Sequence, residues 1–261
     1  MLIEERHRRI LEALKKKPDI TVRELALILC VSEPTVRRDF TELHRKGFIT
    51  KIYGGAILNQ GAADGEIPFV LRQNEKSVIK ADIGNRASSL VRDGMVIMLD
   101  GSTSAYHLIP YLTRYRDLIV ITSGAKTAVA LAEANIRTFC TGGQMLIHSF
   151  SYVGEQAESF VRSINADILF FSCHALTDKG QMTERSIEEA NLRKVMFESC
   201  KQKILLCDSS KFGKTCFYNM GSVRDIDAIV SDMPLPPSIA EIMQKGEKKL
   251  ILKTNSQQSS K

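Results

Sequence analysis

The chain of 261 residues contains no tryptophan, and only 7% of its residues are aromatic. No apolar run approaches the roughly 20 residues of a membrane-spanning helix, and no apolar run follows the polar, basic N-terminus as it would in a signal peptide. The six cysteines follow no paired spacing, which favours reduced thiols over disulfides or a zinc site. We therefore expect a cytoplasmic protein without membrane anchor, metal or cofactor.

The composition that remains, 44% hydrophobic and 25% charged residues, is that of a globular protein with room for one small domain and one large core. Residues 1–58 carry 12 Lys and Arg against 8 Asp and Glu, a balance of +4, whereas residues 59–261 carry 24 against 22. The excess positive charge thus lies mostly on the N-terminal quarter, as expected for a part that meets DNA.

Residues 20–58 predict a helix, a tight turn, a second basic helix and a hairpin. Thr21 and Glu24 have the spacing of a capping box at the start of the first helix. Ser32 is placed to cap the second helix, in which Val36, Phe40 and Leu43 form one buried stripe.

The opposite face of this second helix has the composition of a recognition helix, because Arg can bind guanine and Thr can meet a base edge or a phosphate. A solvated charged face is the alternative, and Lys51 on the hairpin is either a DNA contact or an exposed strand lysine. The residues expected to contact DNA are Ser32, Pro34, Thr35, Arg37, Arg38, Thr41, Arg45 and Lys51.

The flanking segments complete a winged helix-turn-helix. Upstream, an apolar stripe at residues 3, 7, 10 and 14 predicts a third helix, on which His7 is expected to be a packed histidine. Downstream, Gly47 is expected to end the second helix, and residues 48–53 and 56–58 to form two strands around Gly54 and Gly55.

After a small, polar segment, strand-like and helical patterns alternate, which predicts an α/β domain with a mainly parallel sheet covered on both faces. The expected strands are 95–99, 118–121, 136–140, 168–172, 204–207, 228–230 and 249–252. The expected domains are a winged helix-turn-helix at 1–58, a linker at 59–73, an effector-binding domain at 74–253 and a disordered tail at 254–261.

Small, hydroxylic loops follow several of these strands, at the edge where open α/β sheets bind ligands. Glycines let the backbone approach a ligand, hydroxyls and N–H groups can hold a phosphate, and a lysine can neutralise it. Tight turns and helix caps are the structural alternative. The residues expected to bind an effector are Asp100, Gly101, Ser102, Thr103, Ser104, Thr122, Ser123, Gly124, Gly142, Gly143, Glu188 and Lys211.

The run Ser-Glu-Pro-Thr-Val-Arg-Arg-Asp at 32–39, followed by Gly-Gly-Ala at 54–56, resembles the N-terminal signature of DeoR-type transcriptional regulators. The order of the later loops is similar to the effector domain of the same family, whose sheet resembles ribose-5-phosphate isomerase. Tyr53 stands where the family often has histidine, and Ser123 and Gly124 replace a common Asn-Ser pair. The segment with Cys173 and His174 replaces a small, glycine-containing loop, so the roles of these two residues stay open.

The resemblance implies a homo-oligomeric repressor, dimer or tetramer, that binds a double-stranded DNA operator and responds to a phosphorylated sugar. Activation by the metabolite is the other possible sign of the response. A sugar-phosphate isomerase with an added DNA-binding end is the rival, with Asp100, Glu188 and Asp208 as available carboxylates. It is disfavoured because residues 172–177 contain no carboxylate, so we expect binding without catalysis. A constitutive DNA-architectural protein is a third reading.

Overall fold

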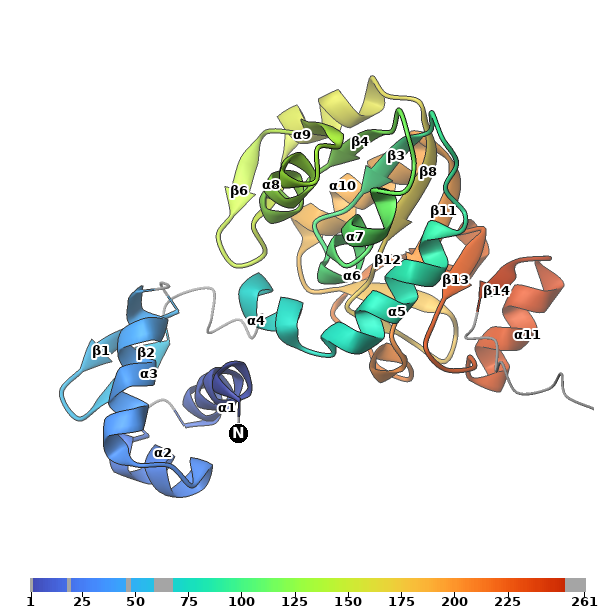
Figure 1. The fold of residues 1–261 in the computed structure, drawn as a ribbon. Coiled ribbons are helices and arrows are strands. Elements are labelled where there is room, and N and C mark those ends of the chain that lie inside the picture. The colour runs from blue at the N-terminus through green and yellow to red at the C-terminus, as the bar shows by residue number, and fades with distance from the viewer. Residues whose placement is uncertain (1, 18–19, 46–47, 59–67, 252–261) are drawn as a thin grey trace, which may run out of the picture. The chain divides into compact units, whose positions relative to one another are not determined.

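The computed structural model describes residues 2–17, 20–45, 48–58 and 68–251. The chain divides into two compact units, Met1–Lys76 and Ser77–Lys261 (Figure 1). The first unit has one hydrophobic core, and the second has a core on each side of its central sheet. No helix within the described ranges is long and apolar enough to cross a bilayer.

The first unit is the predicted winged helix-turn-helix. Its elements are α1 (Ile3–Lys16), α2 (Val22–Leu29), α3 (Glu33–Arg45), β1 (Ile49–Ile52), β2 (Gly55–Leu58) and α4 (Phe69–Asn74). The stripes on the three main helices meet in one core, in which Ile10, Leu25 and Leu43 are fully buried. The antiparallel pair β1–β2 forms the wing.

The start of α2 follows the predicted capping box. The Thr21 N–H donates to Glu24 Oε2 over 2.8 Å, and the Glu24 N–H donates to Thr21 Oγ1 over 3.2 Å. The next N–H of the helix, on Val22, donates to the carbonyl of Gly54 in the wing over 3.0 Å. The wing thus satisfies a backbone donor that the helix itself leaves open.

The turn of the wing lies one residue earlier than the sequence pattern indicated. Tyr53 and Gly54 form the turn, and Gly55 already pairs with Ile52 as the first residue of β2. Gly54 has φ +80°, which favours glycine. At Gly55 the reason is close packing, because a β-carbon there would lie 3.1 Å from the carbonyl oxygen of Ile20. Gly47, expected to end α3, lies outside the described residues.

The first unit extends beyond the expected boundary at residue 58. Part of the expected linker forms α4, in which Phe69 and Leu71 are buried and Val70 packs against the core of this unit. The break between the two units falls after Lys76. Residues 59–67 of the linker and the expected tail at 254–261 lie outside the described residues.

The second unit contains a seven-stranded, all-parallel sheet in the order β14-β13-β11-β8-β3-β4-β5. The strands are β3 (Val96–Leu99), β4 (Ile119–Thr122), β5 (Arg137–Cys140), β8 (Ala166–Phe171), β11 (Cys200–Leu206), β13 (Ala228–Val230) and β14 (Lys249–Ile251). All seven coincide with the predicted strands to within a few residues.

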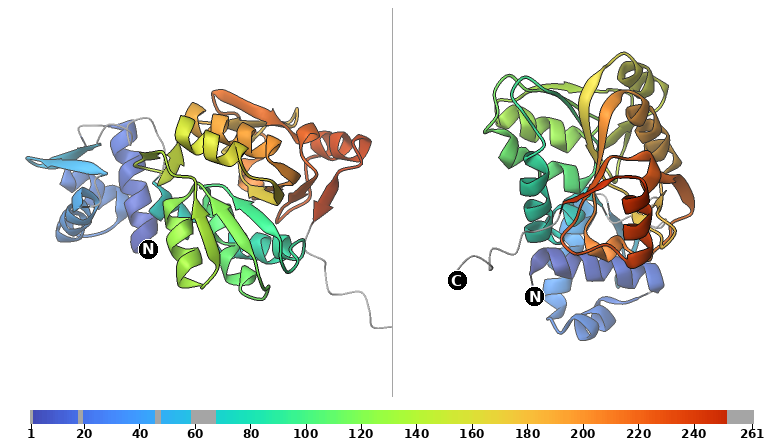
Figure 2. Two further views of the ribbon diagram at one scale, coloured as in Figure 1. Left: turned by 90° about the horizontal axis from the view of Figure 1, so that it is seen from above. Right: turned by 90° about the vertical axis from the view of Figure 1, so that its right-hand side faces the viewer.

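Helices cover both faces of this sheet, which Figure 2 (left) shows nearly edge-on. One face packs against α5 (Ser77–Ser88), α6 (Thr103–Tyr106), α7 (Ile109–Leu112) and α8 (Ala125–Glu133). The other packs against α9 (Glu155–Arg162), α10 (Ile187–Glu198) and α11 (Pro237–Lys245). Alternate residues of a strand serve the two cores, as Ile97 and Met98 of β3 do.

Five short strands were not expected from the sequence. A hairpin joins β6 (Gln144–Leu146) to β7 (Ser151–Val153), and a separate antiparallel sheet has the order β12-β10-β9. The strands of this separate sheet are β9 (Ala175–Leu176), β10 (Gln181–Glu184) and β12 (Tyr218–Ser222). Most contain two to four residues, too few to show an alternating pattern.

The sheet reverses its strand order between β3 and β8. From β3 the chain proceeds to β4 and β5 on one side, and then returns to β8 on the other side of β3. At such a switch point the loops beyond the carboxyl ends diverge and leave room for a ligand. The loops after β3, β4, β8 and β11 therefore lie at the edge of the sheet at which the sequence predicts the effector site.

Candidate functional site

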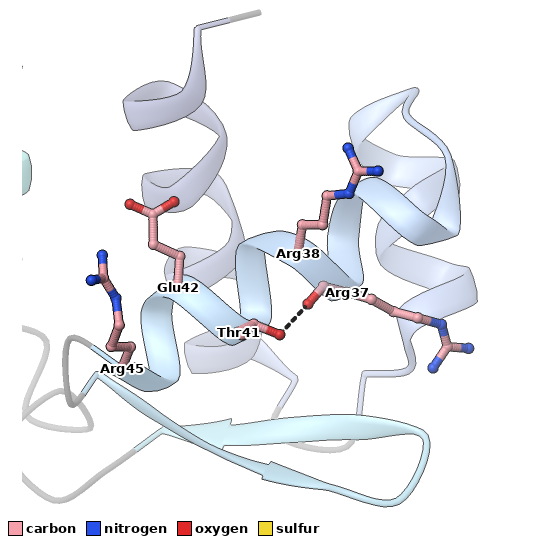
Figure 3. A pocket seen from close by; sticks show the side chains of 5 residues that line it. All are labelled: Arg37, Arg38, Thr41, Glu42 and Arg45. Atoms are coloured by element: carbon pink, nitrogen blue, oxygen red, sulfur yellow. Dashed lines mark hydrogen bonds between the residues drawn. The ribbon is translucent and has the colours of Figure 1, made fainter.

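The exposed face of α3 carries the cationic residues expected to contact DNA. Arg37, Arg38, Thr41 and Arg45 are exposed, whereas Val36 on the opposite face is fully buried. Figure 3 shows these exposed side chains projecting away from the helix axis, with the wing passing beside the helix. The structure thus presents three guanidinium groups along one helix face.

An open hollow of about 470 Å³ lies on this face. It is lined by Arg37, Arg38, Thr41, Glu42 and Arg45. Three arginines against one carboxylate give the hollow a net positive charge, which suits a polyanionic partner.

Local contacts hold part of this face in place. Arg37 forms an exposed ion pair with Glu33 over 3.3 Å, and the Thr41 hydroxyl donates to the Arg37 carbonyl over 2.9 Å. Lys51 of the wing donates to Thr41 Oγ1 over 3.3 Å. The structure therefore brings the predicted wing lysine and the predicted helix residues together.

Ser32, Pro34 and Thr35, which are expected to contact DNA, lie at the start of α3, where their contacts and positions also fit a structural role. The Thr35 N–H lies 3.4 Å from Ser32 Oγ, and the two hydroxyl oxygens are 2.9 Å apart. Pro34 is exposed in the first turn, where proline is tolerated. Contact of these three residues with DNA stays a prediction.

A buried carboxylate that the sequence reading did not single out fixes α3 against α1. Asp39 accepts two hydrogen bonds from Arg6, of 2.6 and 2.9 Å, and lies 3.1 Å from Nε2 of His7. The hydrogen bond to Asp39 raises the pKa of Arg6. Asp39 lies on the same face of α3 as its buried apolar residues, and His7 lies on the apolar face of α1. Two polar residues on the buried faces of neighbouring helices are the pattern from which this contact could have been predicted. His7 is the packed histidine that was predicted, since it is 1% exposed.

In the second unit, Asp100 directly follows β3 and links several of the loops. Its Oδ1 accepts from the Ser102 N–H over 3.0 Å, and its Oδ2 accepts from the Ser172 N–H over 3.1 Å. Oδ2 also accepts from Nε of Arg193 over 2.8 Å. Asp100 is 1% exposed, so both oxygens are used within the protein.

Arg193 of α10 is the centre of a buried ionic cluster that sequence reasoning missed. Its Nη1 donates to Glu184 of β10 over 2.7 Å, and its Nη2 lies 3.7 Å from Glu189. Burial opposes the charge of Arg193, but Glu184, Asp100 and Glu189 outweigh it and raise the pKa of Arg193. Glu189 precedes Arg193 by four residues and Glu184 by nine, but Asp100 lies 93 residues away, so no local motif shows that the three carboxylates meet at this residue.

Glu184 is ionised in this cluster despite complete burial. Burial alone would raise the pKa of Glu184, but Arg193, His174 and Lys211 lower it to about 2. Nδ1 of His174 lies 3.2 Å from Glu184 Oε2. The role of His174, left open by the sequence, is therefore tied at least to this carboxylate.

Lys211 follows β11 and reaches the loop after β8. Its Nζ donates to Ser172 Oγ over 2.6 Å, and the Ser172 hydroxyl donates to the Leu206 carbonyl over 2.6 Å. Lys211, which is predicted to bind the effector, thus contacts Ser172, the residue whose N–H donates to Asp100. Cys173 and Cys207, buried at the same strand ends, are free thiols, and contact with Cys173 and burial raise the pKa of Cys207.

The predicted glycine loops after β3 and β4 also meet. A β-carbon at Gly124 would lie 3.1 Å from the Cα of Gly101 and 2.8 Å from Oγ1 of Thr127. A β-carbon at Gly101 would overlap Oγ of Ser151, which belongs to β7. Both glycines are therefore required by close approach of other groups.

The remaining predicted effector residues have mixed surroundings. Ser102 caps α6 through the Ala105 N–H, Thr122 Oγ1 accepts from the Gly124 N–H, and the Ser123 carbonyl accepts from the Tyr152 N–H. Thr103 and Ser104 are buried.

The last three predicted residues are Gly142 and Gly143, which lie between β5 and β6, and Glu188, which lies at the start of α10. Gly143, with φ +102°, faces the Val153 carbonyl, whereas nothing lies within 4 Å of a β-carbon at Gly142. Glu188 is exposed and accepts from Ser186 Oγ over 2.9 Å. In α10 it is the neighbouring Glu189, and not the predicted Glu188, that reaches Arg193.

Two family domains match this chain and together cover most of it. Residues 6–61 match the DeoR-like helix-turn-helix domain, and residues 75–233 match the DeoR C terminal sensor domain. The two matches correspond to the two units of the structure.

Curated relatives match over nearly the full length. The HTH-type transcriptional regulator YulB of Bacillus subtilis is 32% identical over 245 residues, which are 94% of this chain and 94% of that protein. The glycerol-3-phosphate regulon repressor of Escherichia coli K12 is 25% identical over 92% of this chain and 94% of its own.

Among solved structures, ribose 5-phosphate isomerase A of Methanocaldococcus jannaschii matches with a TM-score of 0.40 at 16% identity. The match covers 52% of this chain and 54% of the isomerase.

Proposed function

The chain belongs to the DeoR family of helix-turn-helix transcriptional regulators, and we propose that it is a repressor whose affinity for operator DNA is set by a phosphorylated sugar. The similarity to a protein named as a glycerol-3-phosphate regulon repressor supports this assignment. The observation that carries it is the pairing, in one chain, of an exposed cationic helix face with a sensor domain whose polar loops converge.

On the DNA side, the proposal assigns readout to the exposed face of α3. Arg38 and Arg45 lie on this face, and the wing lysine Lys51 is joined to it through Thr41. Arg38 is the residue to test first, because guanidinium groups can donate two hydrogen bonds to a guanine. Phosphate contacts from the other cations supply affinity without sequence preference.

On the effector side, the proposal assigns binding to the loops after β3, β4, β8 and β11. Lys211 contributes a cation, and the loops contribute hydroxyl and N–H donors. For the metabolite to control DNA binding, it must bind the DNA-competent and DNA-incompetent states with different affinities, a coupling of about 1–3 kcal/mol in typical cases.

The contacts of the carboxylates weigh against the isomerase alternative. Proton transfer on a sugar needs a positioned acid or base. Asp100 is occupied by two N–H groups and Arg193, and Glu184 is held ionised with a pKa of about 2. The Asp100 oxygens are already hydrogen-bonded within the protein, and a carboxylate with a pKa of about 2 is a weak base, so the proposal is binding without turnover.

The proposal also includes an oligomer that acts in the cytoplasm, where operator DNA is found. Two or more copies would place their recognition helices in successive major grooves, with half-sites about 34–36 Å apart or a multiple of that distance. Light scattering on the purified full-length protein tests this part, and a monomer at micromolar concentration would contradict it.

Operator binding is tested by fluorescence anisotropy with DNA from the promoter of the chain's own gene. We expect Arg38→Ala to weaken specific binding by about 1–3 kcal/mol while binding to unrelated DNA persists. Arg9→Ala is the matched control, since Arg9 is an exposed arginine of the same unit that pairs with Glu5 on α1. Equal operator affinity of the Arg38 variant and the control would remove Arg38 from the readout.

Effector response is tested in the same assay by adding phosphorylated sugars. We expect at least one of them to change operator affinity, and its unphosphorylated counterpart to have no effect. If operator binding by the wild-type protein is specific but indifferent to every phosphorylated sugar, the regulatory part of the proposal fails.

A further inference from the structure

Among the residues that the structure describes, two buried hydroxyl groups beside the glycine loops have no hydrogen-bond partner: Oγ1 of Thr127 and Oγ of Ser151. Thr127 is 0% exposed and Ser151 is 2% exposed. A buried hydroxyl without a partner destabilises the folded state, and native proteins contain few of them. Neither residue was picked out by the sequence, and both need an explanation.

Both hydroxyls are directed at the converging glycine loops. Thr127 Oγ1 would lie 2.8 Å from a β-carbon at Gly124, and Ser151 Oγ would overlap a β-carbon at Gly101. The strand of Ser151 is tied to the same place, because Gly124 and Ser151 form a β-bridge and the Ala125 N–H donates to the Phe150 carbonyl over 2.8 Å. The loop after β3, the start of α8 and the strand β7 thus place the two hydroxyls next to Gly101 and Gly124.

The surroundings of these hydroxyls favour an acceptor with negative charge. The nine-residue helix α8 begins here with Gly124 as its N-cap and has no side-chain cap. Its first N–H, on Ala125, is taken by the Phe150 carbonyl, but the positive end of its dipole lies at the same loops. Lys126, in the first turn of α8, adds a cation. Asp100, which precedes Gly101, already accepts from two N–H groups and from Arg193.

Charge separates this end of the site from the end near β8 and β11. The ionic cluster around Arg193 contains three carboxylates, and with Lys211 it contains two cations, so its net charge is −1 when His174 is neutral. A phosphoryl group carries roughly −1.5 to −2 at neutral pH. It is therefore repelled less at the hydroxyl end, while the uncharged sugar can extend toward Lys211 and His174.

We propose that Thr127 and Ser151 are phosphoryl-binding residues, whose hydroxyls donate to the phosphoryl oxygens of the effector at the start of α8. The inference rests on the proposed function, since it specifies where the effector of that repressor places its charge. It assigns the hairpin strand β7, through Ser151, to the ligand site.

The test compares Ser151→Ala and Thr127→Val with the wild type in the full-length protein. Dye-monitored thermal unfolding is measured with glycerol 3-phosphate, ribose 5-phosphate, fructose 6-phosphate, their unphosphorylated counterparts and inorganic phosphate. We expect phosphorylated compounds to raise the unfolding midpoint of the wild type, and each substitution to weaken their binding about ten- to hundredfold, the effect of losing one hydrogen bond to a charged group. Without ligand, each variant should unfold at the same or a higher temperature, because an unpartnered buried hydroxyl has been removed.

Ser88→Ala is the matched control. Ser88 is fully buried in α5 of the same unit, but its hydroxyl donates to the Asn85 carbonyl over 2.6 Å. Its removal should leave the ligand-induced shift unchanged. A purely structural role for Ser151 or Thr127 would instead lower the midpoint without ligand and leave the shift intact, which would overturn the inference.

The outcomes separate this inference from the function on which it rests. If phosphorylated compounds stabilise the wild type and both variants equally, the phosphoryl assignment is wrong and the repressor proposal stands. If unphosphorylated sugars stabilise the wild type as well as the phosphorylated ones do, the assignment of these hydroxyls to a phosphoryl group also fails. If nothing in the panel stabilises the wild type and nothing changes its operator affinity, both proposals fail.

Discussion

Replacing Asp39 with alanine should destabilise the first unit without removing any of the residues predicted to contact DNA. The Asp39 side chain is 3% exposed and the side chain of Arg6 is 13% exposed, and the two are joined by hydrogen bonds of 2.6 and 2.9 Å. His7, 1% exposed, shares the same carboxylate. Truncation leaves a guanidinium and an imidazole without this acceptor, and Glu42, whose Oε2 lies 3.8 Å from Nε2 of His7, is too far from that nitrogen to replace its hydrogen bond.

The expected loss follows from this burial. Removing one partner of a buried ion pair typically costs about 3–5 kcal/mol, because the remaining charge is left uncompensated. Whole domains are stable by only about 5–15 kcal/mol, and small ones such as the unit Met1–Lys76 bury less surface per residue. We therefore expect α1 and α3 to open about 10² to 10³ times more often, or more.

Hydrogen–deuterium exchange of the full-length protein measures this opening locally, which matters because the chain has no tryptophan to report on one unit by fluorescence. Amides of α1 and α3 should lose protection in Asp39→Ala, while amides of β3 and β8 keep theirs. Asp39→Asn, which retains the shape and one acceptor oxygen, should lose less.

Glu33→Ala is the matched control on the same helix. Glu33 also pairs with an arginine, but the two side chains are 44% and 61% exposed, and such exposed pairs contribute about 0–1 kcal/mol. If Asp39→Ala and Glu33→Ala change the protection of α1 and α3 by the same amount, the reasoning from burial is refuted.

Three further outcomes concern the second unit. Lys211→Ala should leave operator binding intact and weaken the effector response about ten- to hundredfold; loss of operator affinity without ligand would argue against an effector role. Because the pKa of Glu184 is lowered from 4.5 to about 2 in the folded protein, its stabilising effect is complete above pH 4.5 and is lost as the pH falls toward 2. The thermal midpoint should therefore fall below pH 4.5 more steeply in the wild type than in Glu184→Gln, and parallel pH profiles would contradict this. Gly143→Ala should destabilise the unit more than Gly142→Ala, because a β-carbon at Gly143 would lie 2.5 Å from a carbonyl oxygen of β7 whereas Gly142 has open space; equal midpoints for the two variants would disprove the close approach.

The elements that sequence patterns predicted well are those whose cause is local. The strand Ala228–Val230 was predicted with its observed bounds, because a short apolar run between turn residues is typical of a buried parallel strand. The start of α2 was predicted by a capping box that spans four residues. In both cases the decisive contacts lie within a few positions of one another.

What the sequence did not predict depends on contacts between distant residues. Arg193 binds Asp100, 93 residues away, and Asp39 binds Arg6, 33 residues away, so neither pairing leaves a local pattern. The turn of the wing was misplaced by one residue because two adjacent glycines fit it equally well by propensity, and the packing of Gly55 against Ile20 decided between them.

In the candidate site, too, the residues with a local sequence pattern could be predicted and those placed by tertiary contacts could not. The glycine and hydroxyl loops could be predicted because small residues after a buried strand have a recognised use at the carboxyl edge of a sheet. Ser151 could not, since β7 contains only three residues and meets the loop at Gly101 through the fold alone. The helix α4, within the expected linker, was missed for a related reason. Its residues are apolar enough to join a core, but the core that they join depends on tertiary packing.

Both units use a buried arginine–carboxylate contact to fix a helix that carries function, although apolar packing of equal volume is often as stabilising. What such a pair adds is geometry, since a guanidinium fork satisfies its acceptors in few orientations. Arg193 shows the consequence, because it binds the loop after β3 through Asp100 and the strand β10 through Glu184 at the same time. A ligand that displaces the Asp100 loop must break one of these contacts or move β10 and α10 with it. The cluster therefore couples the loop after β3 to β10 and α10, and a coupled element of this kind is what the proposed regulation by a ligand would use.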